Sequence, residues 1–180
     1  MVELRTARLM LRPCRPEDRD DLIALELDPE VMRFLNGGPV NHDHTHPEDV
    51  TFLMPRGTEP DVWVAQELHS LAFVGWFGLF EDSSEQAEIG YRLRRNVWGQ
   101  GLAPEGAGAL IGWGFDIVGY DRIVASTMAV NLASRRVMEK LGMRHTRTDF
   151  SEWSDPIPGS DHGEVWYEVT RASWCKRATA

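Results

Sequence analysis

Residues 96–106, Asn-Val-Trp-Gly-Gln-Gly-Leu-Ala-Pro-Glu-Gly, constrain the fold of this chain more than any other stretch. The alternating run 87–93 before them predicts a strand, and the apolar segment 102–118 predicts a helix. The first two glycines allow a tight turn and a close backbone approach, and the proline suits a first helical turn. Because free N–H groups at a helix start carry partial positive charge, the loop is suited to bind phosphate.

Two known phosphate-binding motifs do not fit this loop. A Walker loop needs a Lys-Ser/Thr pair after its glycines, which residues 96–106 lack. A dinucleotide fingerprint opens a βαβ unit, whereas this loop follows several strand-like segments. Another phosphate ligand, or a tight connection with no ligand, remains.

Length and composition predict a single domain over residues 1–180. No apolar run approaches the roughly 20 residues that cross a bilayer, and the N-terminus lacks the layout of a signal peptide. We therefore expect a soluble, cytoplasmic protein with no membrane partner. Cys14 and Cys175 lack metal-ligand or redox spacing, which indicates two reduced thiols.

The net charge of −9 argues against a nucleic-acid partner, because such proteins need a basic face to displace counterions. An acidic surface instead favours cationic partners such as amines or basic peptides through long-range steering.

Periodicity predicts a fold that mixes strands and helices. Strands 62–68, 71–80 and 87–93 form an antiparallel meander, in which Gly75 and Gly78 indicate a bulge or a close backbone approach. Strand 122–127 follows a crossover helix and should lie parallel to strand 87–93. The interior glycines of helix 102–118 indicate close packing onto the sheet. The other expected strands are 8–12, 144–150 and 165–169, and the other expected helices are 16–27, 29–35, 48–54 and 132–141.

Three histidines, His42, His44 and His46, stand at every second residue. In an extended segment they would share one side, a geometry that zinc or nickel could use. No cysteine or carboxylate pattern completes a closed site, so a polar surface loop is the favoured interpretation and no metal is assigned. We expect the region around residues 34–56 to line a substrate entrance.

Two motifs occur together in the right order. Glu88-Ile89-Gly90-Tyr91 precedes the loop 98–103, and Asn131-Leu132-Ala133-Ser134 leads to Glu139-Lys140-Leu141-Gly142-Met143 later in the chain. This pairing resembles the GNAT superfamily of acetyl-CoA-dependent N-acetyltransferases. The opening stretch 6–13 is similar to the RimJ/RimL-like branch, which acetylates N-termini of ribosomal proteins. The resemblance implies a mixed α/β (α+β) domain with a mostly antiparallel sheet of about seven strands, splayed at the cofactor cleft and flanked by about four helices.

The resemblance also implies roles for particular residues. The backbone amides of the loop would hold the pyrophosphate of CoA, and the preceding strand would pair with its pantetheine arm. Asn131 matches a residue that bonds this arm, and Ser134 matches a hydroxyl near the sulfur. An ordinary helix cap and an ordinary first-turn serine are their alternatives. The implied cofactor-binding residues are Ile89, Tyr91, Leu93, Trp98, Gly99, Gln100, Gly101, Leu102, Ala103, Asn131 and Ser134.

The sequence departs from the family pattern at two places. Asn96 stands where arginine or glutamine is common, which is tolerable because backbone amides carry the phosphate contact. Met138 stands where many relatives have a tyrosine thought to protonate the thiolate. That tyrosine mechanism is excluded at position 138, so Ser134 or a water acts instead, or the thiolate leaves unprotonated.

Direct transfer to an amine requires a base, because an ammonium group is largely protonated at neutral pH. Glu88 is the first candidate for this base, and Ser134 is the second catalytic candidate. Glu105 is less suitable because it stands one turn into the helix after the loop. A backbone N–H near Ile89 to Tyr91 could polarise the thioester carbonyl.

The leading hypothesis is an N-acetyltransferase acting on a primary amine, which is a protein N-terminus or a small molecule such as a polyamine-like metabolite or an aminoglycoside. A non-catalytic acetyl-CoA-binding regulatory module is the alternative, motivated by Asn96 and Met138. Relatives often pair through their late strands, which leaves a homodimer open.

Overall fold

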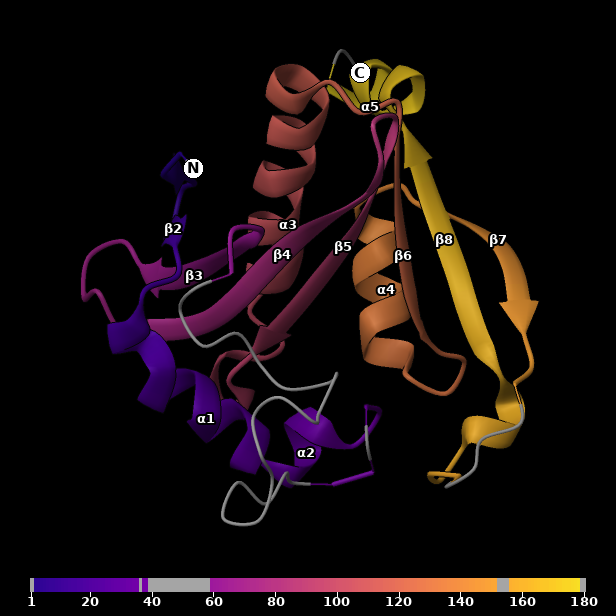
Figure 1. Cartoon of the computed structure of the whole chain (residues 1–180), viewed down its shortest axis with the longest axis horizontal. Helices are drawn as coiled ribbons and strands as arrows, with labels where there is room; N and C mark the ends of the chain where they lie inside the picture. The colour runs from indigo at the N-terminus through magenta and orange to yellow at the C-terminus, as the bar shows by residue number, and fades with distance from the viewer. Residues whose placement is uncertain (1, 36, 39–58, 152–155, 179–180) are drawn as a thin grey trace.

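A computed structural model describes residues 2–35, 37–38, 59–151 and 156–178 of the chain. The described strands form one eight-stranded sheet in the order β1-β2-β3-β4-β5-β6-β8-β7 (Figure 1). All neighbouring strands are antiparallel except β5 and β6, which are parallel as expected. The strands are β1 Leu4–Arg5, β2 Leu9–Pro13, β3 Val62–Glu67, β4 Phe73–Ser83, β5 Gln86–Leu93, β6 Arg122–Met128, β7 Arg144–Asp149 and β8 Glu164–Thr170.

Helices pack on both faces of the sheet. Side chains alternate along β3, so that Trp63 and Ala65 join the core under α3, whereas Val62 and Val64 join the core under α1. The described helices are α1 Arg19–Leu27, α2 Pro29–Met32, α3 Leu102–Trp113, α4 Leu132–Lys140 and α5 Arg171–Ala178. None of these is long and apolar enough to cross a membrane.

Close packing of the interior glycines of helix 102–118 is found at Gly106 and Gly114 but not at Gly108 and Gly112, where a Cβ atom would make only ordinary contacts. A Cβ atom at Gly106 in α3 would lie 2.4 Å from the ring of Phe77, and one at Gly75 would lie 2.1 Å from the carbonyl oxygen of Arg92. Gly75 has a φ of 154° and stands beside the register shift between β3 and β4. The predicted bulge is therefore confirmed.

Four elements differ from the expectations. The strand β1 is only two residues long, too short for an alternating pattern to reveal, and α5 was not anticipated. The helix expected over 102–118 is α-helical to Trp113 and continues as a π-helix over Gly114–Val118. Pro29–Met32 is shorter than the helix expected over 29–35. The helix expected over 48–54 and the three histidines lie outside the described residues.

The sheet opens between β5 and β6. These strands pair only from Gln86 to Glu88 on β5 and from Arg122 to Val124 on β6, although both continue beyond that point. In Figure 1 the two strands separate below their paired ends, with α3 behind one and α4 beside the other. The expected splay is confirmed, and it positions the candidate site.

Candidate active site

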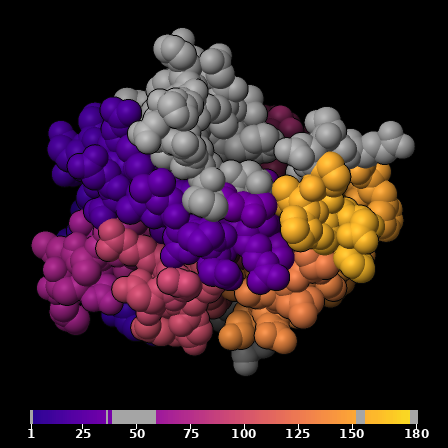
Figure 2. Space-filling model, turned by 90° about the horizontal axis from the view of Figure 1, so that it is seen from below, coloured from indigo at the N-terminus to yellow at the C-terminus, as the bar shows by residue number. Residues whose placement is uncertain are grey.

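A cavity of about 740 Å³ occupies the gap between β5 and β6. Consecutive residues of β5, from Glu88 to Leu93, line it. Because successive residues of a strand point to opposite faces, the cavity reaches through the sheet. Figure 2 shows the molecule from below, where the indigo to purple N-terminal residues lie between the magenta to pink residues of the middle of the chain and the orange residues that follow β6. Of the residues predicted from sequence, those lining the cavity are Glu88, Ile89, Tyr91, Leu93, Trp98, Gly99, Gly101, Leu102, Ala103, Asn131 and Ser134.

The glycine loop forms one wall of the cavity. Gly99 and Gly101 have φ values of 75° and 78°, a left-handed conformation that favours glycine. Gly101 is the N-cap of α3 and offers no side-chain cap, so the first N–H groups of this helix have no side-chain acceptor there. Gln100 does not line the cavity; its side chain donates to the carbonyl of Asn96 at 3.2 Å. This turn is a cradle that an anion can occupy.

Glu88 stands at the last paired position of β5, where the strands begin to separate. Its carboxylate accepts a hydrogen bond from the hydroxyl of Ser126 on β6 at 3.0 Å. Burial raises the pKa of Glu88, and the carboxylates of Glu164 and Asp82 raise it further, against the lowering effect of Ser126. A carboxylate with a raised pKa at the cavity wall is suited to accept a proton.

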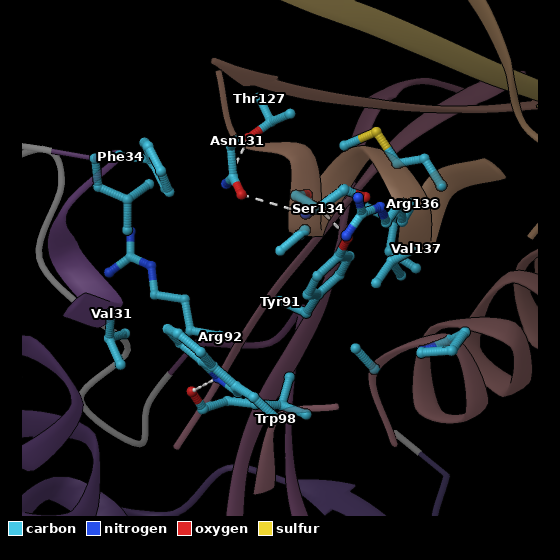
Figure 3. A pocket seen from close by; sticks show the side chains of 18 of the residues that line it. Val31, Phe34, Tyr91, Arg92, Trp98, Thr127, Asn131, Ser134, Arg136 and Val137 are labelled. Carbon is cyan, nitrogen blue, oxygen red and sulfur yellow. Dashed lines mark hydrogen bonds between the residues drawn. The ribbon is translucent and has the colours of Figure 1, made fainter. Parts of the chain in front are cut away.

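Asn131 and Ser134 begin the helix α4 on the other side of the gap. The side-chain oxygen of Asn131 accepts from the backbone N–H of Ser134 at 3.2 Å, and its amide donates to the hydroxyl of Thr127 at 3.0 Å (Figure 3). Asn131 is therefore the cap of α4, one of the two interpretations left open by the sequence. Ser134 is not an isolated serine, because its hydroxyl lies 3.0 Å from the hydroxyl of Tyr91.

Comparison with known proteins gives the family. Residues 8–144 match the family model described as the acetyltransferase (GNAT) domain. The chain belongs to the GNAT acetyltransferases. A protein of Aspergillus fumigatus named FsC-acetyl coenzyme A-N(2)-transacetylase is 34% identical over 96% of this chain and 78% of its own length.

Solved structures of GNAT acetyltransferases share the fold. An acetyltransferase from Bacillus anthracis superposes with a TM-score of 0.77 at 22% identity, covering 95% of this chain and 99% of that one. Spermidine N-acetyltransferase from Vibrio cholerae, in complex with CoA and spermine, superposes with a TM-score of 0.73 at 15% identity, covering 93% and 98%. The family match and the 34% identical relative show that the chain is an acyl-CoA-dependent acetyltransferase, and the non-catalytic alternative is set aside.

The cavity suits acetyl-CoA, the cosubstrate of GNAT acetyltransferases. A Cβ atom at Gly99 would meet nothing within 4 Å, so the space in front of the turn is open. The Arg8 guanidinium donates to the carbonyl of Gln100 at 2.8 Å, but its charge is paired with the carboxylate of Glu105. The favourable feature for a pyrophosphate is therefore the uncapped start of α3.

Glu105 is a structural residue in this GNAT domain. Its carboxylate accepts hydrogen bonds from the hydroxyl of Thr6 at 2.6 Å and from the backbone N–H of Arg8 at 2.8 Å, and it pairs with the Arg8 guanidinium. Burial acts in the opposite direction, but these bonds lower the pKa of Glu105 overall. The side chain braces the N-terminal strands against α3 and does not line the cavity.

Arg92 is a cavity residue that the sequence reasoning missed. Its guanidinium lies over the ring of Trp76 at 5.5 Å and points toward the segment that carries Val31 and Phe34 (Figure 3). Burial lowers the pKa of Arg92 to about 10, although the carboxylate of Glu26 works in the other direction. The alternation of β5 could have indicated Arg92 as a cavity residue, because Arg92 lies on the same face of the strand as Glu88. Among the described residues, no group of three or more metal-ligating side chains occurs.

Proposed function

We propose that this acetyltransferase transfers the acetyl group directly to the nitrogen of a primary amine, with Glu88 as the base. The observation that carries the proposal is the position of the Glu88 carboxylate, at the fork of β5 and β6 and on the wall of the cavity. Its raised pKa brings proton uptake closer to neutral pH than for an ordinary glutamate.

Each part of the cavity has a role in this proposal. The amides of residues 98–103 hold the pyrophosphate, and the backbone of β5 from Ile89 to Leu93 pairs with the pantetheine arm. Acetyl-CoA supplies the acetyl group as a thioester. A backbone N–H of β5 polarises the thioester carbonyl while Glu88 takes the proton of the attacking amine. Asn131 orients the first turn of α4, so that the Ser134 hydroxyl faces the leaving sulfur.

Among acceptors, we propose a small-molecule amine. The Aspergillus fumigatus protein is 34% identical to this chain, and its name specifies transfer to an N(2) nitrogen. A protein N-terminus is the second candidate, because the opening stretch 6–13 is similar to the RimJ/RimL-like branch. Thr6 and Arg8 in that stretch hydrogen-bond to the carboxylate of Glu105, which gives the stretch a structural role. The similarity is therefore weaker evidence for a protein N-terminus as the substrate.

A screen of amines tests the acceptor class. The purified protein is mixed with acetyl-CoA and with small α-amines, polyamines, aminoglycosides or peptides with free N-termini, and thiol release and acetylated products are measured. The proposal predicts release with a small amine and an acetyl group on its primary nitrogen. Acetylation of peptides alone would favour the second candidate, and aminoglycoside acetylation would single out that compound class.

A homodimer is a further proposal. β7 is an edge strand of the sheet, and its first four residues are exposed. An exposed edge offers unpaired backbone groups to a second copy. Light scattering after size-exclusion chromatography gives the mass in solution, and a monomer would contradict this proposal.

A further inference from the structure

A pair of hydroxyl groups bridges the gap between β5 and α4. The hydroxyl of Tyr91 lies 3.0 Å from the side-chain oxygen of Ser134, a pair in which either oxygen can donate, and 3.4 Å from the Ser134 carbonyl oxygen (Figure 3). Both residues line the cavity. The Tyr91 ring packs beside Phe77, with ring centroids 6.1 Å apart, which holds the hydroxyl toward α4.

The helix α4 itself carries no tyrosine. Met138, which occupies the family's tyrosine position, is buried and can donate no hydrogen bond. A serine hydroxyl has one donor and can also accept. In the arrangement in which Tyr91 donates its one proton to the serine oxygen, the serine proton is free to point into the cavity. We propose that Tyr91 positions Ser134 to donate a hydrogen bond to the departing CoA thiolate. This rests on the proposed placement of Ser134 at the sulfur.

The pKa values decide between a hydrogen bond and a proton transfer. Burial raises the pKa of Tyr91 to about 12, whereas an ordinary thiol has a pKa of about 8.5. A phenol this weakly acidic keeps its proton in front of a thiolate. The reaction balances without it: the N–C bond forms, the C–S bond breaks, its electron pair stays on sulfur, and the amine proton goes to Glu88. Ser134, held by Tyr91, stabilises the negative sulfur.

Binding of CoA compared with desulfo-CoA, which lacks the sulfur, tests this role without the acceptor amine. A bound thiol with a lowered pKa makes CoA bind more tightly above the pKa of the free thiol, about tenfold for each unit of lowering. In calorimetric titrations from about pH 6.5 to 9.5, we expect the CoA to desulfo-CoA affinity ratio of the unaltered protein to rise with pH. Tyr91→Phe and Ser134→Ala should each remove most of this rise, and the double variant should remove no more.

Controls separate positioning from packing. Tyr120→Phe removes another phenol hydroxyl, which donates to Glu81 at 3.4 Å outside the cavity, and should leave the ratio unchanged. Tyr91→Phe should also lower kcat about tenfold while the KM for acetyl-CoA stays constant. If Tyr91→Phe keeps the full pH-dependent rise that Ser134→Ala loses, the positioning role is wrong. A rise that survives both variants overturns the placement of Ser134 at the sulfur, and binding of neither ligand would contradict the cofactor site itself.

Discussion

At the scale of single residues, the pKa of Glu88 depends on three effects that do not all act in the same direction. Burial and two nearby carboxylates raise its pKa, and the hydrogen bond from Ser126 lowers it. The hydroxyl of Ser126 therefore tunes the pH at which the proposed base becomes available. Glu88 lies on β5 and Ser126 on β6, so this side-chain hydrogen bond also joins the two strands just beyond their last backbone pair.

Removing the Ser126 hydroxyl gives a prediction with a defined sign. Ser126→Ala removes a bond that stabilises the charged form of Glu88, so the pKa of the carboxyl rises further. The acid limb of the kcat/KM profile should then move to higher pH, with activity lost at low pH and retained at high pH. Ser70→Ala, in the β3–β4 turn, is a matched control that should leave the profile unchanged. A Ser126→Ala profile identical to the parent would contradict the coupling of the two side chains.

At the scale of elements, the packing of α3 against β4 depends on a glycine in the helix. Gly106 faces the ring of Phe77, whereas Gly108, half a turn further along α3, would place a Cβ atom at an ordinary 3.5 Å from Leu141. Helix glycines cost about 1 kcal/mol relative to alanine. Gly106 therefore has a steric reason to be glycine, whereas the space around Gly108 would accept a methyl group.

These two glycines form a matched pair of variants. Gly106→Ala should destabilise the protein by about 1–3 kcal/mol, because the new methyl group collides with Phe77. Gly108→Ala should raise the free energy of unfolding by up to about 1 kcal/mol through helix propensity. Chemical denaturation measures both, and equal effects of the two substitutions would contradict the packing described for α3.

Local patterns were sufficient to predict the meander, the glycine loop and the parallel pairing of β5 with β6. The gap between these strands was predicted only through the family resemblance. The two-residue β1 was missed because alternation needs a longer run, and the π-helical end of α3 has the same apolar spacing as the α-helix before it. The Tyr91–Ser134 contact joins residues 43 positions apart, and no spacing rule connects a strand tyrosine to the first turn of a later helix.

At the scale of the whole molecule, Glu105 connects the start of the chain to α3. Its bonds to Thr6 and Arg8 span 99 and 97 positions of sequence. They hold the guanidinium of Arg8 beside the glycine loop. Glu88 and Tyr91 lie on opposite faces of β5, and in the proposed mechanism Glu88 serves the acceptor amine whereas Tyr91 serves Ser134 on α4.

Replacing Glu105 should lower the stability of the protein in a pH-dependent way. Glu105→Gln removes charge-assisted bonds and should cost about 1–3 kcal/mol of unfolding free energy at neutral pH. Because the folded pKa of Glu105 is lowered, its contribution is present above the unfolded value of about 4.3 and is lost as pH falls through the folded pKa. Thermal unfolding at several pH values checks this, with the exposed Glu85→Gln as control. An equal loss at pH 7 and at strongly acidic pH would contradict it.

The most direct test of the proposal that Glu88 is the base is the rate of thiol release by the Glu88→Gln variant. The rate is measured with acetyl-CoA and the best amine of the screen. Loss of a general base should lower kcat by about 10²–10⁴-fold, with acetyl-CoA affinity unchanged and the acid limb of the pH profile abolished. A Glu88→Gln enzyme that retains the parental rate and pH profile would contradict the assignment of Glu88 as the base.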